Sequence, residues 1–208
     1  MKEYHKIETL FERDLNGTKK LIEGKFRNPA IEYLKDNQWQ FTEKIDGTNI
    51  RIYWDGHKIT IGGRTDNAQI HGGLIQKLNE LFGGETNAQI FEQQFGNKAV
   101  YLIGEGYGAG IQTGGGYRED KSFILFDVMV SDIFLPREAV EVIAQAFNID
   151  VVPIIMTGTI DEAVQFIKTK PMSTIGTMEM EGVVGKPLVE MTDVFGNRMI
   201  VKIKVCDF

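Results

Sequence analysis

Three strand-like segments follow one another in the first third of the chain, and they constrain the fold more than any other feature. Residues 39–45, 49–54 and 57–62 read as strands, and Asp55 with Gly56 between the last two is a two-residue hairpin signal. Strands joined by so short a turn pair antiparallel. The chain is therefore expected to contain antiparallel sheets. Further strands are expected at residues 99–105, 122–130, 178–186 and 198–206.

Helices are expected between these strands. Asn28 is an N-cap for the first, and Thr159 with Glu162 forms a capping box for the last. Gly83 and Gly84 are expected to end the second. Together the elements predict one α+β domain of antiparallel sheets flanked by helices. The expected helices run from Pro29 to Leu34, from Leu74 to Phe82, from Pro136 to Phe147 and from Thr159 to Ile167.

Composition excludes several classes of protein. Hydrophobic residues make up 42% and charged residues 25% of the 208 residues, and no apolar run approaches the ~20 residues that span a bilayer. The N-terminus lacks the apolar core of a signal peptide, so a cytoplasmic protein is expected. Cys206 is the only cysteine, which excludes an internal disulfide. The net charge of −6 argues against a broad non-specific hold on nucleic acid and allows a small basic site.

A lysine stands where the first of these strands ends. In KIDGTN, Gly47 allows a tight turn, so the amine of Lys44 can point into a cleft with Asp46 and Asn49 near it. A lysine that is partly desolvated, or that lies beside other cations, loses proton affinity and becomes a usable nucleophile. A hairpin with a solvated lysine explains the same stretch, so this motif alone leaves both interpretations open.

Two more lysines share one face of a strand near the C-terminus. In MIVKIKVCDF, side chains two positions apart point the same way, so Lys202 and Lys204 point away from the apolar face. That face is formed by Met199, Val201, Ile203 and Val205. A pair of ammonium groups suits an anion. A charged edge strand that discourages aggregation is the alternative.

Three carboxylates lie at or near strand ends: Glu105, Asp127 and Glu181. An acid in an apolar strand needs a partner such as a metal ion or a lysine. By strict alternation Glu181 and Lys186 face opposite ways, so they share a site only if the strand bulges or ends near Gly185. Carboxylates set against several lysines suggest a site for a metal ion and a polyphosphate, because Mg²⁺ takes oxygen ligands and bridges phosphates.

Two further side chains fit such a site. Arg64 follows two glycines after a strand, where a phosphate could approach, although a solvated loop arginine explains the position equally well. Phe126 in FILFDV could stack on a base, or it could be part of the core.

Taken in order and spacing, these motifs resemble the nucleotidyltransferase motifs of polynucleotide ligases and capping enzymes. Within that superfamily the chain looks most like the ATP-dependent RNA ligases related to the second RNA ligase of bacteriophage T4. The resemblance covers about residues 4–205, nearly the whole chain. It rests on KIDG at 44–47, GEGYG around Glu105, FILFDV at 123–128, EGVVGKP at 181–187 and VKIK at 201–204.

The resemblance implies a three-step reaction. Lys44 would attack the α-phosphorus of ATP and become a lysyl-adenylate, AMP would pass to an RNA 5′-phosphate, and a 3′-hydroxyl would then displace AMP. Lys202 and Lys204 would hold the α-phosphate and the leaving group, and Lys186 would be a further phosphate contact. Glu181 would be linked to the Mg²⁺ or Mn²⁺ ion, with Asp46 in a metal-water role.

The remaining site residues would hold the rest of the nucleotide. The resemblance places Asn49 and Glu105 on the ribose or phosphate side and Arg64 on the ribose or the 5′-phosphate. It places Phe126 on adenine as a stacking partner. Glu43 stands where family members contact adenine, through its side chain or its backbone.

Two departures from the family pattern bear on these expectations. The T4-type enzymes carry histidine where this chain has Asp46, although K-x-D-G is the usual form in the wider superfamily. Relatives usually continue into a second domain that engages nucleic acid, whereas residues 1–208 are expected to form a single adenylyltransferase domain with no C-terminal nucleic-acid-binding domain. RNA ends are the expected partners, and a separate protein could supply the missing RNA-binding surface.

Other functions are compatible with the same motifs. A DNA ligase and a GTP-using capping enzyme share them, while the KIDGTNIR context favours ATP and RNA. A non-catalytic module that binds a nucleotide or an RNA end is a further alternative. Against it stands the complete set of acids and lysines, since a decayed site would be expected to have lost at least one. An α+β interaction domain with chance motifs is the last alternative.

Overall fold

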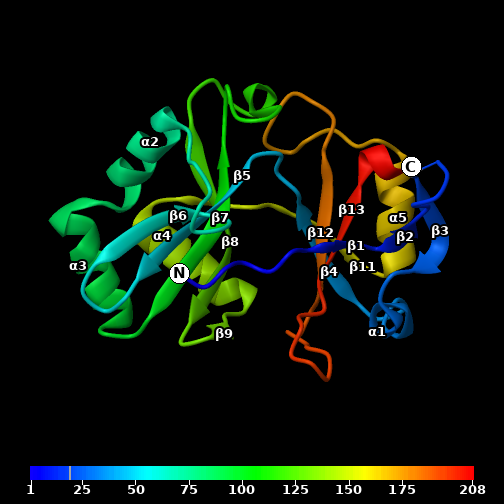
Figure 1. Cartoon of the computed structure of the whole chain (residues 1–208), viewed down its shortest axis with the longest axis horizontal. Helices are drawn as coiled ribbons and strands as arrows, with labels where there is room; N and C mark the ends of the chain where they lie inside the picture. The colour runs from blue at the N-terminus through cyan, green and yellow to red at the C-terminus, as the bar shows by residue number, and fades with distance from the viewer. Residues whose placement is uncertain (19) are drawn as a thin grey trace. The chain divides into compact units, whose positions relative to one another are not determined.

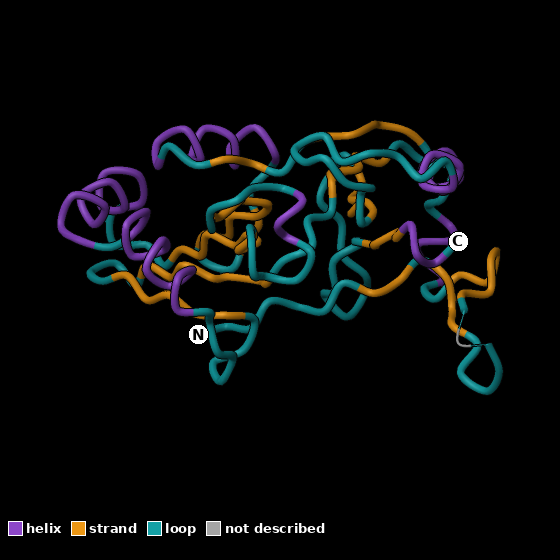
Figure 2. Tube along the Cα trace, turned by 90° about the horizontal axis from the view of Figure 1, so that it is seen from above, coloured by secondary structure: helices purple, strands orange, loops and turns teal. Residues whose placement is uncertain are grey.

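A computed structural model describes residues 1–18 and 20–208 of the chain. The chain divides into two compact units, and each contains both helices and strands (Figures 1 and 2). Unit 1 comprises Met1–His5 and Asp46–Val152, and unit 2 comprises Lys6–Ile45 and Pro153–Phe208.

Unit 1 is built on a sheet of strand order β10-β8-β7-β5-β6, with β9 paired to β8. All its pairs are antiparallel except β10 with β8. The strands are β5 (Thr48–Trp54), β6 (Ile59–Gly63), β7 (Val100–Tyr107), β8 (Ser122–Val130), β9 (Ile133–Phe134) and β10 (Asp150–Val151). The helices are α2 (Gly72–Phe82), α3 (Gly84–Phe95) and α4 (Arg137–Phe147), and Gly114–Gly116 form a 3₁₀ turn.

The two faces of the unit 1 sheet differ in character. On one face, Ile50, Leu102 and Leu125 belong to a core completed by apolar residues of α2, α3 and α4. The opposite face carries polar groups, because the register pairs Asn49 with Glu105. Alternation along the strands therefore separates the face that packs on the core from a face with polar side chains.

Unit 2 is built on a sheet of strand order β1-β13-β12-β4-β11, in which only β1 and β13 are parallel. A separate pair, β2 and β3, adds a small antiparallel sheet. The strands are β1 (Glu8–Thr9), β2 (Phe11–Arg13), β3 (Leu21–Phe26), β4 (Trp39–Glu43), β11 (Ile154–Gly158), β12 (Gly182–Pro187) and β13 (Val201–Lys204). The helices are α1 (Pro29–Tyr33) and α5 (Ile160–Lys168), and Val205–Asp207 form a 3₁₀ turn.

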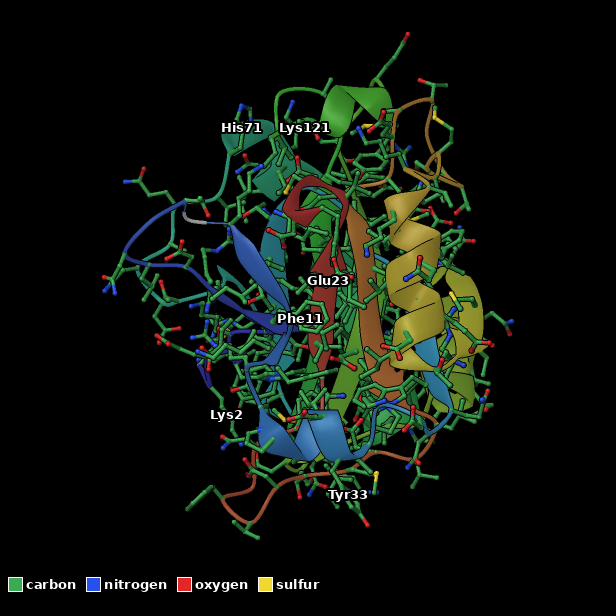
Figure 3. All side chains as sticks on the ribbon, turned by 90° about the vertical axis from the view of Figure 1, so that its right-hand side faces the viewer. Lys2, Phe11, Glu23, Tyr33, His71 and Lys121 are labelled. Carbon is green, nitrogen blue, oxygen red and sulfur yellow. The ribbon has the colours of Figure 1, made fainter. Side chains whose placement is uncertain are left out.

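Helix α5 supplies the core of unit 2. It lies beside the strands of the five-stranded sheet (Figure 3). Its residues Ile160, Val164 and Ile167 pack with apolar side chains of β4, β12 and β13. The capping box of Thr159 and Glu162 starts this helix, as the sequence predicted. Only one face of the sheet can pack on α5, which leaves the other face for charged residues.

The sequence predicted many of the elements and missed one long helix and several short strands. The four predicted helices and the fold class of antiparallel sheets flanked by helices are confirmed. Helix α2 ends at Phe82, before Gly83 and Gly84, as predicted, and a further helix, α3, begins at Gly84, where φ is +82°. The β5–β6 turn spans residues 55–58 rather than two residues, because the Asp55 carboxylate accepts hydrogen bonds from the next backbone N–H groups. The missed elements are α3, β1, β2, β3, β9, β10 and β11.

The predicted strand at residues 178–186 is shorter than expected. The observed β12 begins at Gly182, so Glu181 lies before the strand and not within it. The predicted strand at 198–206 is likewise shorter in the structure, where β13 covers only Val201–Lys204. None of the helices in the part of the chain that the structure describes is long and apolar enough to cross a membrane.

The close packing of β4 on β12 leads to a test of unit 2. A Cβ added at Gly185 would lie 2.4 Å from Cε1 of Phe41. Because overpacking a core typically costs about 1–3 kcal/mol, Gly185→Ala is expected to lower the free energy of unfolding by that amount in urea titrations. Gly72→Ala is the control, since nothing lies within 4 Å of a Cβ there. Equal stability of the two variants would contradict the packing described.

Candidate nucleotidyl-transfer site

Lys44 follows β4 directly and is held at both its backbone and its amine. Its backbone N–H donates to the carbonyl of Gly182 at 2.9 Å. Its Nζ donates to Oε2 of Glu181 at 2.6 Å. A quarter of the side chain is exposed. The amine is therefore accessible to a substrate and directed by a carboxylate.

Glu181 joins two lysines. Its Oε2 pairs with Lys44, and its Oε1 pairs with Nζ of Lys204 at 2.8 Å. The carboxylate is 14% exposed, so both ion pairs are partly shielded from water. The backbone carbonyl of Glu181 also accepts from the N–H of Val205 at 3.0 Å. The ends of β4, β12 and β13 thus meet around one carboxylate, and the expected lysine partner of Glu181 is found.

Gly182 allows Glu181 to take this position. Its φ of +156° is rarely adopted by residues with a side chain. A Cβ at this position would lie 2.1 Å from the carbonyl oxygen of Ile203. The backbone turn at Gly182 takes Glu181 out of the alternation of β12, so strand alternation does not set its direction.

The register of unit 2 gathers further lysines on one face. Val184 is opposite Lys202 on β13 and opposite Thr42 on β4, and Lys186 follows two residues later on the same face. Lys204 lies on this face as well, opposite Gly182. The apolar residues Met199, Val201 and Ile203 are buried on the other side, as predicted. Val205 begins a 3₁₀ turn and is partly buried, and it packs against the same core.

The two β13 lysines have different acid–base properties. Burial, followed by the charges of Lys44 and Lys204, lowers the pKa of Lys202. Burial acts in the same direction on Lys204, but its hydrogen bond to Glu181 and the charge of that carboxylate outweigh it and raise the pKa of Lys204. Glu181 therefore stabilises the charge of one lysine and leaves its neighbour on the strand under cationic repulsion.

Glu43 precedes Lys44 but its side chain points to the core. It is 1% exposed. Its Oε1 accepts from Oγ of Ser173 at 2.5 Å, and its Oε2 accepts from both N–H and Oγ1 of Thr174. The side chain therefore anchors the loop before β12. Of the two predicted ways for Glu43 to contact adenine, only the one through its backbone is compatible with this position. Sequence reasoning missed Ser173 and Thr174, which lie about 130 residues further along the chain.

In unit 1, Asp46 is held by the glycine-rich segment after β7. Its Oδ2 accepts from Oγ1 of Thr113 at 2.5 Å and from the N–H of the same residue at 3.3 Å. Its backbone N–H donates to the hydroxyl of Tyr117 at 3.1 Å. Neither partner was expected from the sequence.

Asn49 and Glu105 are brought together as partners on β5 and β7. The side-chain oxygen of Asn49 is buried and has no hydrogen-bond partner among the residues that the structure describes. A buried acceptor without a donor costs about 1–3 kcal/mol. The position is therefore suited to a ligand that brings a hydrogen-bond donor.

The other expected unit 1 residues have varied surroundings. Phe126 lies at a β-bulge of β8, with its ring 5.5 Å from that of Tyr4. Tyr4 donates its hydroxyl to Asp127 at 2.6 Å, so this buried acid has a partner within the unit. Arg64 is exposed directly after β6. The stacking and phosphate roles of Phe126 and Arg64 stay predictions.

Glu181 and Asp46, the two residues expected to bind metal, belong to different units. Within residues 1–18 and 20–208, no group of three or more His, Cys, Asp or Glu side chains could hold a metal ion by itself. Both oxygens of Glu181 are engaged by lysines. A metal role for either acid stays a prediction.

The sequence profile of the RNA ligase family matches residues 37–204, which include every lysine of this site. The chain belongs to the RNA ligase family. No curated protein matches the chain in sequence.

Solved structures of Naegleria gruberi RNA ligase share the fold of this family member. A variant with ATP and manganese has a TM-score of 0.66 at 19% identity, covering 85% of this chain and 51% of the other. A variant with AMP and manganese has a TM-score of 0.66 at 17% identity, covering 95% and 60%. The enzyme with pyrophosphate has a TM-score of 0.62 at 18% identity, covering 98% and 62%. The chain thus spans about half to three-fifths of their length.

The anchoring of Glu43 can be tested separately from chemistry. Glu43→Gln replaces a carboxylate that accepts three hydrogen bonds, and hydrogen bonds to charged groups contribute about 1.5–3 kcal/mol. A loss of stability in that range is expected in thermal or urea unfolding. Glu179→Gln, an exposed change in the same loop, should stay within about 0.5 kcal/mol of the parent protein. If Glu43→Gln is as stable as this control, the carboxylate does not anchor the loop.

The opposite pKa shifts of Lys202 and Lys204 predict different reactivities. At pH 9 the lowered pKa of Lys202 gives a larger fraction of neutral amine than the raised pKa of Lys204. Limiting acetic anhydride should therefore acetylate Lys202 faster, as measured by peptide mass spectrometry. In Glu181→Gln the difference should shrink, because Lys204 loses its charged partner. Faster acetylation of Lys204 in the parent protein would contradict these electrostatics.

Proposed function

We propose that this protein is an ATP-dependent RNA ligase that forms a lysyl-adenylate on Lys44, transfers AMP to an RNA 5′-phosphate and seals that end to a 3′-hydroxyl, acting in the cytoplasm. The observation that carries the proposal is the amine of Lys44, partly exposed and 2.6 Å from a carboxylate that is shared with a second lysine. Membership of the RNA ligase family and the fold of ATP-bound relatives support it.

The first step is an exchange at phosphorus. The Lys44 ammonium loses a proton to give the neutral amine, whose lone pair attacks the α-phosphorus of ATP. A P–N bond forms, the bond from the α-phosphorus to the bridging oxygen breaks, and pyrophosphate leaves with that electron pair. The nitrogen then loses a second proton. Oε2 of Glu181 lies within hydrogen-bond distance of this amine and orients it for attack.

The lysines of β12 and β13 fit the charge that this step creates. Lys202 and Lys204 share a face with Lys186 next to the nucleophile. In-line transfer builds negative charge on the α-phosphate and on the leaving pyrophosphate, which fixed ammonium groups stabilise. Lys202 is the most suited to a phosphate, since no carboxylate pairs with it in the described part of the chain and its own charge is destabilised by two neighbouring lysines.

A divalent ion fits beside these groups. Mg²⁺ and Mn²⁺ take oxygen ligands, and Mg²⁺ usually binds through one or two carboxylates together with substrate phosphates. Glu181 and Asp46 are the acids that would contribute. When bound, the ion would neutralise phosphate charge and favour loss of the proton from the amine.

The unit 1 residues would bind the rest of the nucleotide. The unpaired oxygen of Asn49 is available to accept a hydrogen bond from a ribose hydroxyl, with Glu105 beside it. Phe126 would stack on adenine, and Arg64 would contact the ribose or the RNA 5′-phosphate. Glu43 would reach adenine through its backbone. RNA ends are the proposed partners, with a further protein supplying RNA-binding surface.

Self-adenylylation tests the first step. Incubation with Mg²⁺ and α-labelled ATP should give a covalent label that survives denaturation and is lost in Lys44→Ala. Lys202→Gln should reduce the label by at least ~100-fold if the lysine supplies about 2.7 kcal/mol of transition-state stabilisation. Lys98→Gln, an exposed change in unit 1, should label normally. A well-folded parent protein that takes no label from ATP or GTP would disprove the proposal.

The choice of polynucleotide requires a second assay. Nicked RNA, nicked DNA and single-stranded RNA carrying a 5′-phosphate should be supplied to the labelled protein. Sealing of RNA ends with release of AMP is expected. Equal or better sealing of DNA would point to a DNA ligase, and exclusive labelling by GTP would point to a capping-type enzyme.

A further inference from the structure

The glycine-rich segment 108–117 forms hydrogen bonds with both the side chain and the backbone of Asp46. Thr113 donates to Oδ2 of Asp46 through both its hydroxyl and its backbone N–H, and the Tyr117 hydroxyl accepts from the Asp46 backbone. Oδ1 accepts no hydrogen bond from any residue that the structure describes. One oxygen of this carboxylate is therefore fixed while the other is available.

Internal hydrogen bonds and close backbone contacts stabilise the conformation of this segment. Successive turn hydrogen bonds join Gly108 to Ile111, Ile111 to Gly114, and Gly114 to Tyr117. A Cβ at Gly114 would lie 2.4 Å from the carbonyl oxygen of Gly108, so the segment folds back closely on itself. Tyr117 is buried, and its ring packs edge-on against Tyr107 at 6.0 Å. A threonine mounted on this frame has little freedom to move.

The residue before Thr113 is in an unusual conformation. Gln112 has φ +48°, a left-handed backbone that is unfavourable for residues with a side chain. Such strain persists where the surrounding structure over-determines it, and it is common beside functional groups. Here it brings both donors of the next residue onto one carboxylate oxygen.

We propose that Thr113 is a positioning residue that fixes the rotamer of Asp46 for adenylyl transfer, with Tyr117 fixing the backbone of the same residue. The inference rests on the proposed function, since Asp46 lies two residues after the nucleophile Lys44 in the K-x-D-G motif. A carboxylate on a free side chain would sample several rotamers, and ordering it would then oppose substrate binding. The two donors of Thr113 supply that order before substrate arrives.

A variant series can separate positioning from folding. At saturating ATP, Thr113→Val should slow single-turnover adenylylation by about 10-fold or more, because it removes a hydrogen bond to a charged group. The KM for ATP should change little, since the contact is made to a catalytic-motif side chain and not to the nucleotide. Thr113→Ser retains the hydroxyl and should restore the rate to within about twofold of the parent. Thr113→Ala, without the branched side chain, should behave like Thr113→Val.

The matched control is Thr60→Val, an exposed change on β6 with no effect expected. In an Asp46→Asn background, Thr113→Val should have no further effect on the rate, because the two residues act through one interaction. An adenylylation rate for Thr113→Val equal to that of Thr60→Val would overturn the inference and leave the proposed function intact. Absence of label in the parent protein would overturn both. Equal slowing in the Asp46→Asn and parent backgrounds would assign Thr113 a structural role and overturn the inference alone.

Discussion

One carboxylate organises the charged end of unit 2. Glu181 stands between Lys44 and Lys204, and its backbone carbonyl and that of the next residue hold the chain after β13 and after β4. Without this acid, two partly shielded ammonium groups would face each other uncompensated, which is far costlier than leaving exposed charges unpaired. The position in turn depends on a glycine that alone fits the backbone conformation at the start of β12. The positions of Lys44, Glu181 and Lys204 therefore depend on a backbone feature and not on the side chains alone.

The same alternation that builds the core of unit 2 builds its reactive face. Residues of β4, β12 and β13 that point one way pack with α5, and the other face carries Thr42, Lys186, Lys202 and Lys204 together with Val184. The two acids on either side of Lys44 have different surroundings. Glu43 points inward and ties the strand end to the loop before β12, while Asp46 is tied to the segment after β7 in unit 1. The acids before and after Lys44 therefore both have carboxylate oxygens that accept hydrogen bonds within the protein.

The sequence predicted what alternation and capping determine, and little of what long-range contacts determine. The strand β8, the faces of β13 and the capping box of α5 follow from local patterns. The sequence predicted that Glu181 needs a partner such as a lysine or a metal ion, but it did not predict that the partner is Lys44. The geometry of this ion pair depends on a glycine φ angle that has no signature in a strand pattern. The contacts of Thr113 and Ser173 join residues 67 and 130 positions apart, and short polar side chains of this kind are ordinary in loops. No periodicity or cap in the sequence could have paired them with their acids.

The difference between Lys202 and Lys204 explains why the site needs two lysines on one strand face. Lys204 is paired with Glu181, which stabilises its charge in the free protein, and the same ion pair holds the carboxylate that contacts Lys44. Among the residues that the structure describes, no carboxylate pairs with Lys202, and burial together with neighbouring cations makes its charge unfavourable. An anion arriving at this face removes that penalty, so part of the favourable energy of binding a phosphate is relief of repulsion already present in the free protein. If Lys202 and Lys204 exchanged surroundings, both effects would be lost. Glu181 would no longer be held by Lys204, and a phosphate at the position of Lys202 would meet an ammonium group already paired with a carboxylate.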